Sequence, residues 1–293
     1  MKSLKPLFSH PVFSKNPIKS ISRILRWQFT KRIIRQPIVF KSKTFLLKCY
    51  PDSHQASGFV YFNGYPEFNS MSFVESLLRP GDRVLDVGAN IGVYTLFCAS
   101  LIGTEGVVDA FEPAEIPRLR LLENLALNGF NNVTVHNALL SDQNGPVGFA
   151  DQGADCSVAH IVSEHGAANR IVAKTLDEMV RDQHYLFGKM DIEGAEPLAL
   201  QGARIMLAAR NPPIWQLEFD GYCKRYGWTS DRFAEWLLEH GYRLGVYDGK
   251  KRQLILTQAP WLVFNSNERN VLAVSEPGLG LMKQRIDLDY IRR

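Results

Sequence analysis

The chain has 293 residues, of which 45% are hydrophobic, 22% charged and 11% aromatic. This composition is typical of a globular protein and excludes a fibrous, collagen-like or largely disordered chain. The formal net charge is only +4, and the length allows one large α/β domain with extensions.

The cysteines indicate neither a disulfide framework nor a zinc site, because they lie far apart and form no CxxC pair. They are Cys49, Cys98, Cys156 and Cys223. Reduced thiols and a cytoplasmic location are expected. The N-terminus has no continuous apolar segment of the kind found in signal peptides. The longest apolar stretch, Ile91 to Ile102, is shorter than the roughly 18 residues that a transmembrane helix requires.

The positive charge is concentrated at the N-terminus. The first 51 residues hold 12 Lys and Arg and no Asp or Glu, which leaves 22 basic against 30 acidic residues in the rest. Residues 1–17, rich in Pro, Ser and Lys, are expected to be poorly ordered. From residue 18 to 36, apolar residues four apart predict an amphipathic helix with a basic opposite face. The stripe is Ile21, Leu25, Phe29 and Ile33.

Two interpretations of this helix remain open. Its stripe packs on the body of the protein, or residues 18–36 make peripheral contact with an anionic membrane surface.

The rest of the chain alternates strands and helices. Extended segments are expected at 37–50 and 58–62, followed by a helix at 70–78. Strands are expected at 84–87, 107–111, 133–138, 187–192, 214–219, 242–247, 253–257 or 261–264, and 271–274, with helices at 91–101, 114–128, 175–181, 196–209 and 230–240. Residues 143–170 are expected to be mostly loop. Apolar strands that alternate with helices predict an α/β fold with a doubly wound, mostly parallel sheet and an antiparallel C-terminal hairpin. The expected organisation is a basic arm (1–50), one domain (51–275) and a tail (276–293).

A turn rich in small residues follows the first predicted parallel strand, between Gly88 and Gly92. It is not a dinucleotide fingerprint, which needs glycines where Asn90 and Val93 stand, nor a P-loop, which needs a GK[ST] ending. Glu112 ends the next strand, where a carboxylate can accept hydrogen bonds from both hydroxyls of a ribose. These features favour a nucleoside ligand.

Several blocks then occur in a recognisable order: LDVGANIGVYTL, AFEP, ENLALNG, NALLSD, KTLDE, KMDIEGAE and PPIWQLEF. Between residues of about 80 and 220 the chain resembles the FkbM family of S-adenosylmethionine-dependent methyltransferases. The resemblance implies a class I methyltransferase fold and S-adenosylmethionine as cofactor. It does not extend to the basic arm.

The resemblance also implies which residues bind the cofactor. The glycine turn would hold its methionine end, Glu112 its ribose, and the end of the third strand its adenine. The expected set is Asp86, Gly88, Ala89, Asn90, Gly92, Glu112, Pro113, Asn137, Ala138, Leu139, Ser141 and Asp142.

The acceptor side is expected at the end of the fourth strand. Strand alternation places Asp191 and Glu193 on one face, next to the cofactor cleft, and both are predicted to be catalytic. A hydroxyl acceptor needs a base, and a carboxylate can serve. Glu218, His160 and His165 are further candidates for contact with the substrate. Carboxylates could instead hold Mg²⁺ or Ca²⁺, but the sequence shows no tight run of acidic ligands and no metal site is predicted.

The predicted function is O-methylation of a hydroxyl on a sugar or glycan, a glycolipid or a secondary metabolite. The acidic body argues against a nucleic-acid acceptor, since it would repel phosphates. Two alternatives remain: an RNA methyltransferase that uses the basic arm, and a catalytically silent cofactor-binding module that docks through its N-terminal helix.

Overall fold

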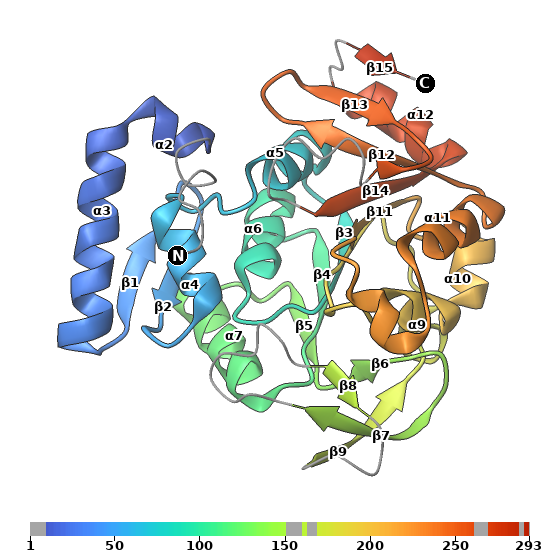
Figure 1. Ribbon diagram of the computed structural model, residues 1–293, viewed down its shortest axis with the longest axis horizontal. Coiled ribbons are helices and arrows are strands. Elements are labelled where there is room, and N and C mark those ends of the chain that lie inside the picture. Colours follow the sequence, from blue (N-terminus) through green and yellow to red (C-terminus); the bar gives the residue numbers. More distant parts are fainter. Residues whose placement is uncertain (1–9, 151–159, 163–168, 261–268, 287–289, 293) are drawn as a thin grey trace.

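A nine-stranded sheet forms the centre of the protein (Figure 1). The computed structural model describes residues 10–150, 160–162, 169–260, 269–286 and 290–292. The strand order is β15-β13-β12-β14-β11-β10-β3-β4-β5. The strands are β3 (Arg83–Val87), β4 (Val107–Phe111), β5 (Val133–His136), β10 (Phe187–Met190), β11 (Ile214–Glu218), β12 (Tyr242–Asp248), β13 (Gln253–Leu256), β14 (Asn270–Ser275) and β15 (Tyr290–Arg292).

The direction of the strands confirms the predicted α/β class. The five strands from β5 to β11 are parallel to their neighbours, whereas β14 pairs antiparallel with both β11 and β12. The antiparallel hairpin of β12 and β13 follows, and β15 adds to β13 in parallel. The parallel strands therefore end at one edge of the sheet, which is where doubly wound folds bind ligands.

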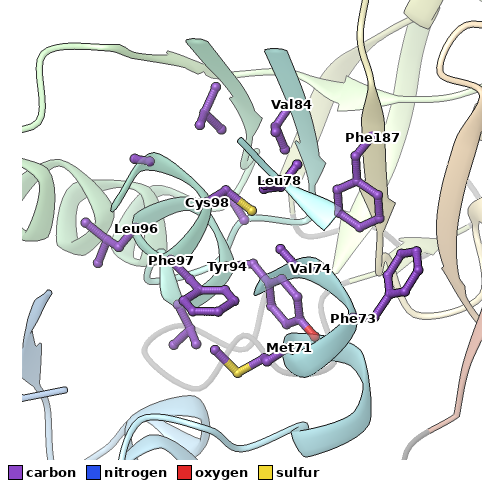
Figure 2. Close-up of a cluster of buried hydrophobic side chains, with 14 of the residues drawn as sticks. Met71, Phe73, Val74, Leu78, Val84, Tyr94, Leu96, Phe97, Cys98 and Phe187 are labelled. Atoms are coloured by element: carbon purple, nitrogen blue, oxygen red, sulfur yellow. The ribbon is translucent and has the colours of Figure 1, made fainter. Parts of the chain in front are cut away.

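Alternate residues of each parallel strand enter different cores, because successive side chains point to opposite faces. Val84 and Phe187 join one core, while Leu85 and Met190 join the other. Figure 2 shows the first core, in which Val84 and Phe187 lie near Phe73 and Phe97 of two covering helices. The helices on this face are α5 (Phe68–Leu77), α6 (Val93–Ile102), α7 (Glu115–Asn128) and α12 (Glu276–Arg285). Both faces of the sheet are thus buried.

The second face is covered by shorter helices: α8 (Leu176–Val180), α9 (Glu196–Gln201), α10 (Arg204–Ala208) and α11 (Ser230–Glu239), with the 3-10 turn η3 (Tyr222–Tyr226) beside them. The prediction of one helix over 196–209 is wrong, since the chain breaks between α9 and α10. At the break, a Cβ on Gly202 would lie 2.1 Å from the carbonyl oxygen of Ser141. Close backbone packing, which sequence periodicity does not reveal, interrupts this helix.

A second sheet has four strands, some of them in residues expected to be loop. These are β6 (Leu139–Leu140), β7 (Gly145–Ala150), β8 (His160–Val162) and β9 (Asn169–Lys174), in the order β6-β9-β7-β8. The prediction of a loop-rich stretch over 143–170 is therefore wrong for β7, β8 and the first two residues of β9. Phe149 of β7 pairs with both Asn169 and Ile161, so the sheet depends on pairing between distant segments.

The N-terminal region is more ordered than expected over its described part. It holds α2 (Pro11–Lys15), α3 (Pro17–Phe29), the π-helical turn η1 (Thr30–Ile34), β1 (Ile38–Lys41), β2 (Leu46–Cys49) and α4 (His54–Tyr61). Residues 11–17, predicted to be poorly ordered, begin two helices, and residues 1–9 lie outside the described ones. The extended segment predicted at 58–62 is wrong, because α4 forms there and Ser53 caps it by accepting a bond from the Ala56 amide.

Side chains of α7 attach the hairpin of β1 and β2 to the domain. Asn124 accepts a hydrogen bond from the Lys48 amide at 2.7 Å and donates one to the Ile91 carbonyl at 3.0 Å. Asn128 bonds both the amide and the carbonyl of Leu46 at 2.7 Å. The side-chain amides of Asn124 and Asn128 thus bond the backbone of β2 as a neighbouring strand would.

The predicted apolar stripe faces outward. Leu25 is 64% exposed and Ile33 67%, whereas Trp27, on the opposite side of α3, is 1% exposed. Trp27 and Lys31 both donate to the Ser57 hydroxyl of α4, at 3.0 and 3.1 Å. The interpretation in which the stripe packs on the body of the protein is therefore wrong.

The segment 276–293, expected as a tail, contains α12, which contacts β14 and α5. None of the helices in the described part of the chain is long and apolar enough to cross a membrane.

Candidate active site

A cleft of about 230 Å³ lies at the carboxyl ends of β3, β4, β10 and β11. Helix α4 and the residues before α5 contribute to its wall, and so does the second sheet. Its lining residues are Gln55, Glu67, Val87, Gly88, Asn90, Phe111, Glu112, Pro113, Ala138, Leu139, Leu140, Phe149, Ile161, Asp191, Ile192, Glu193, Ala195 and Glu218. The cleft thus joins the two predicted regions, the glycine turn and the acidic strand end.

Glu112 organises one end of the cleft. Its two carboxylate oxygens accept hydrogen bonds from the amides of Asn90 and Ala114, each at 2.8 Å. Asn90 adopts a left-handed conformation with φ of 50°, which asparagine tolerates better than most residues. Burial raises the pKa of Glu112 to about 7, although the two amides favour the ionised form. Each oxygen keeps a lone pair for a ligand hydroxyl.

Gly88 brings the glycine turn against the end of β10. A Cβ at this position would lie 2.0 Å from the Asp191 carbonyl oxygen, and the φ of Gly88 is +84°. Both the close approach and the positive φ require glycine. The packing of this one residue sets the distance between the turn and the acidic strand end.

Asp86 lies behind the turn and does not line the cleft. Its Oδ2 accepts a bond from the Thr95 hydroxyl at 2.6 Å, while Oδ1 has no hydrogen-bond partner among the described residues. Burial raises its pKa, and the nearby ammonium of Lys189 opposes that shift. Asp86 therefore joins the end of β3 to α6 through Thr95.

The other predicted cofactor residues divide into two groups. Asn90, Pro113, Ala138 and Leu139 line the cleft, together with Gly88 and Glu112. Ala89, Gly92, Asn137, Ser141 and Asp142 do not line it. Gly92 precedes the first turn of α6, and the Ser141 hydroxyl donates to Asp142 at 3.0 Å.

Asp191, Glu218 and Lys189 form an ionic cluster at the other end of the cleft. The buried ammonium of Lys189 lies 2.8 Å from Asp191 Oδ2. Burial alone would raise the pKa of Asp191, but Lys189 outweighs it and the net pKa is lowered. Burial and the charge of Asp191 raise the pKa of Glu218. Asp191 is thus ionised at neutral pH, and Glu218 is a protonated carboxyl facing it.

Glu193 also faces the cleft, in the turn after β10. Its φ of 59° is left-handed, which costs about 1–3 kcal/mol in a residue other than glycine. Burial and the charges of Asp191 and Asp220 raise its pKa to about 8. Asp191 and Glu193, predicted to act together, therefore share the cleft in different ionisation states at pH 7.

Glu196 holds the backbone of this turn through hydrogen bonds. It is 1% exposed, and its Oε1 accepts bonds from the amides of Ile192 at 2.8 Å and Gly194 at 3.4 Å. Burial raises its pKa to about 8. Its role is to hold the backbone that carries Asp191 and Glu193.

The raised pKa values predict that folding stability falls with pH. A buried carboxyl that is protonated up to pH 8 in the folded state ionises near 4.5 when unfolded, so its stabilising contribution is lost as pH rises through the folded pKa. We expect the wild-type melting temperature to be lower at pH 8.5 than at pH 6. Glu196→Gln keeps an acceptor oxygen and should reduce this difference. Thermal unfolding across this pH range measures it.

Glu235→Gln, on the exposed side of α11, is the matched control and should follow the wild-type curve. A Glu196→Gln protein with the full wild-type pH dependence would contradict the assignment.

The sequence did not single out two residues that reach the cleft from the N-terminal side. Glu67 Oε2 accepts bonds from the Tyr94 hydroxyl at 2.6 Å and from Asn270 Nδ2 at 2.7 Å. Gln55 lines the cleft from α4, and its Oε1 has no hydrogen-bond partner within the described structure. None of the sequence blocks quoted above contains Glu67 or Gln55.

The structure does not describe the side chains of two histidines that were expected near the substrate. His160 begins β8, but only its backbone is described, and His165 lies outside the described residues. In the described ranges, no group of three or more His, Cys, Asp or Glu is arranged to hold a metal ion.

Comparisons with known proteins add to this geometry. Residues 86–244 match the methyltransferase FkbM domain, which is more than half of the chain. Over 47 residues the chain is 55% identical to the 31-O-demethyl-FK506 methyltransferase FkbM of Streptomyces tacrolimicus, covering 16% of this chain and 18% of that protein. Over 60 residues it is 47% identical to a protein-L-isoaspartate O-methyltransferase of Ignicoccus hospitalis, covering 20% and 28%.

Among solved structures, an rRNA methylase from Streptococcus thermophilus aligns with a TM-score of 0.37 and 14% identity, over 70% of this chain and 91% of that one. The matched stretches span less than a third of the two curated relatives, whose names give acceptors that differ in kind. The sheet order, with an antiparallel strand between β11 and β12, is that of a class I methyltransferase. With the domain match, this shows that the chain belongs to the FkbM methyltransferase family.

Proposed function

We propose that the protein transfers a methyl group from S-adenosylmethionine to a hydroxyl group of a sugar-containing or similarly hydroxylated acceptor. The observation that carries this proposal is the packing of Gly88 on the Asp191 carbonyl. This contact brings the ionised Asp191 into the same cleft as the turn that Glu112 holds. A methyl donor bound at the turn and an acceptor bound at Asp191 would meet without further rearrangement.

The residues at the cofactor end fit S-adenosylmethionine. The carboxylate of Glu112 would accept bonds from the ribose hydroxyls. Apolar side chains of Phe111, Leu139 and Phe149 line the same cleft and suit the faces of an adenine. The cofactor would supply an electrophilic methyl group on its sulfonium.

Asp191 is the group that would accept the proton of the acceptor hydroxyl. Lys189 keeps it ionised, and a positioned general base contributes roughly 10²–10⁴-fold to reactions that remove a proton. Protonated Glu218 would donate a hydrogen bond to Asp191 and fix its orientation.

The chemistry of the wall favours an acceptor with several hydroxyls. The carboxyl-bearing residues Glu67, Asp191 and Glu193 line this part of the cleft, so a ligand that donates hydrogen bonds is matched there. A phosphate backbone would meet like charge at Asp191. This supports a sugar hydroxyl over an RNA acceptor.

Calorimetric titration with S-adenosylmethionine and S-adenosylhomocysteine tests the first half of the proposal, and micromolar binding of both is expected. Transfer of a labelled methyl group to glycolipids, free sugars and single-stranded RNA tests the second half. If the RNA became labelled while the glycolipids and sugars did not, the result would favour the RNA methyltransferase alternative. Binding of the cofactor with no transfer to any of them would favour a catalytically silent module.

A further inference from the structure

The outward stripe of α3 continues across η1 to β1 as one surface. We call this the outer apolar face. Its members are 46–82% exposed: Ile18, Ile21, Leu25, Phe29, Ile33 and Val39. In Figure 1, α3 lies at the left edge of the protein, with α4 and the β1–β2 hairpin between it and the central sheet. Large contiguous apolar patches on a protein surface commonly mark interaction sites.

Folding does not require this face, because α3 is attached by its other side. Trp27 is buried and bonds Ser57. Arg23 donates to the carbonyls of Val60 at 2.7 Å and Tyr61 at 2.9 Å. A basic side chain therefore faces the protein while the isoleucines and leucine of the same helix face out, the reverse of the arrangement on a typical surface helix.

A groove borders the outer apolar face where η1 passes β1. It has a volume of about 810 Å³, and its lining includes the apolar Phe29, Ile34, Ile38 and Val39 and the basic Lys19, Arg23 and Arg26. The groove therefore combines apolar and basic groups beside the outer apolar face.

The charged side chains of the N-terminal segment that carries this face are all basic. Lys19, Arg26, Arg32 and Arg35 are exposed near the stripe, and no Asp or Glu occurs before Asp52. A second copy of the same face would bring like charges together, which is unfavourable. An anionic lipid surface matches both features, since it offers negative headgroups above an apolar layer.

We propose that the outer apolar face is a docking surface for an anionic lipid bilayer, with its apolar side chains inserted at the headgroup level. Helix α4 links this surface to the cleft, because it bonds α3 through Ser57 and carries Gln55. A protein docked in this way would hold its cleft near the membrane. The proposal stands on the N-terminal helices alone and does not depend on the proposed methyl transfer.

Vesicle cosedimentation with the full-length protein tests the proposal. Vesicles of phosphatidylcholine with about 30% phosphatidylglycerol should retain the protein, whereas pure phosphatidylcholine should retain far less. Raising the salt concentration from about 0.1 to 0.5 M should weaken the binding. The pair Leu25→Asn with Phe29→Asn should lower the partition coefficient about 10-fold or more. Arg26→Gln with Arg32→Gln should lower it on anionic vesicles.

The matched control is Leu119→Asn with Leu122→Asn on α7, where the two leucines are 51% and 45% exposed. This pair should leave partitioning unchanged, and all variants should keep the wild-type melting temperature and cofactor affinity. Absence of binding to anionic vesicles, or equal loss in the control, would overturn the proposal. A protein that binds no lipid, but whose mass in sedimentation velocity changes when Leu25 and Phe29 are replaced, would also overturn it. That result would identify a second copy of the chain as the partner of this face.

Discussion

Replacing Asp191 with asparagine is expected to lower the turnover number about 10²–10⁴-fold and to leave cofactor affinity within a few-fold of wild type. The loss follows because asparagine cannot take the proton from the acceptor hydroxyl. Cofactor binding should persist, since Gly88 contacts the backbone carbonyl of residue 191 and not its side chain. Asp86 and Glu67 also lie near enough to balance the charge of Lys189. Initial rates with the acceptor found by the transfer screen, together with titration of S-adenosylhomocysteine, measure the two effects.

Glu218→Gln is the matched variant for this prediction. An amide can donate to Asp191 as a protonated carboxyl does, so turnover should stay within about 10-fold of wild type. Wild-type turnover in Asp191→Asn would remove Asp191 as the base. Equal losses in both variants would instead indicate that the pair acts as a unit.

Removing the Glu112 carboxylate is expected to weaken binding of S-adenosylhomocysteine by about 100-fold or more. Two hydrogen bonds to a charged group are worth about 1.5–3 kcal/mol each, and Glu112→Ala also frees the amides of Asn90 and Ala114. Glu112→Gln, which retains one acceptor oxygen, should show a smaller loss. Calorimetric titration gives the dissociation constants, and Glu123→Ala on the outer side of α7 should bind like wild type.

Because the pKa of Glu112 is raised, the affinity for S-adenosylhomocysteine should depend on pH. A folding defect would not produce this dependence. Ribose hydroxyls favour the ionised carboxylate, whereas the free protein has a Glu112 pKa of about 7. The affinity should therefore rise about 10-fold from pH 6 to pH 8, and Glu112→Gln should abolish that rise. A pH-independent affinity in the wild type, or unaltered binding by Glu112→Ala, would remove the ribose assignment.

The parallel strands were predicted from the sequence because each is a short apolar run bounded by turn residues. The strand predicted at 107–111 matches β4 as observed, and that at 214–219 differs from β11 by one residue. Their order in the chain also placed Glu112 and Asp191 at one edge of the sheet. The topology of a doubly wound sheet brings such strand ends together whatever the details of packing.

The structural features that were missed depend on contacts between distant segments. The pairing of β7 with β9 involves residues too far apart in the chain for local patterns to reveal. Residues 58–61 look extended by composition, but belong to a helix that packs between α3 and β2. Gln55 enters the cleft only because that helix lies there.

Residue order and backbone alternation were enough to predict the fold class and the two strand ends that form the cleft, and the motif blocks were enough to indicate the family. Which face of α3 is buried and which carboxyls ionise depend on contacts between distant parts of the chain. Periodicity shows that Leu25 and Phe29 share a face but not whether that face meets protein or solvent. Likewise, Asp191 and Glu218 are both carboxyls in the sequence. The ammonium of Lys189, 2.8 Å from Asp191, lowers the pKa of Asp191, whereas burial and the charge of Asp191 raise that of Glu218.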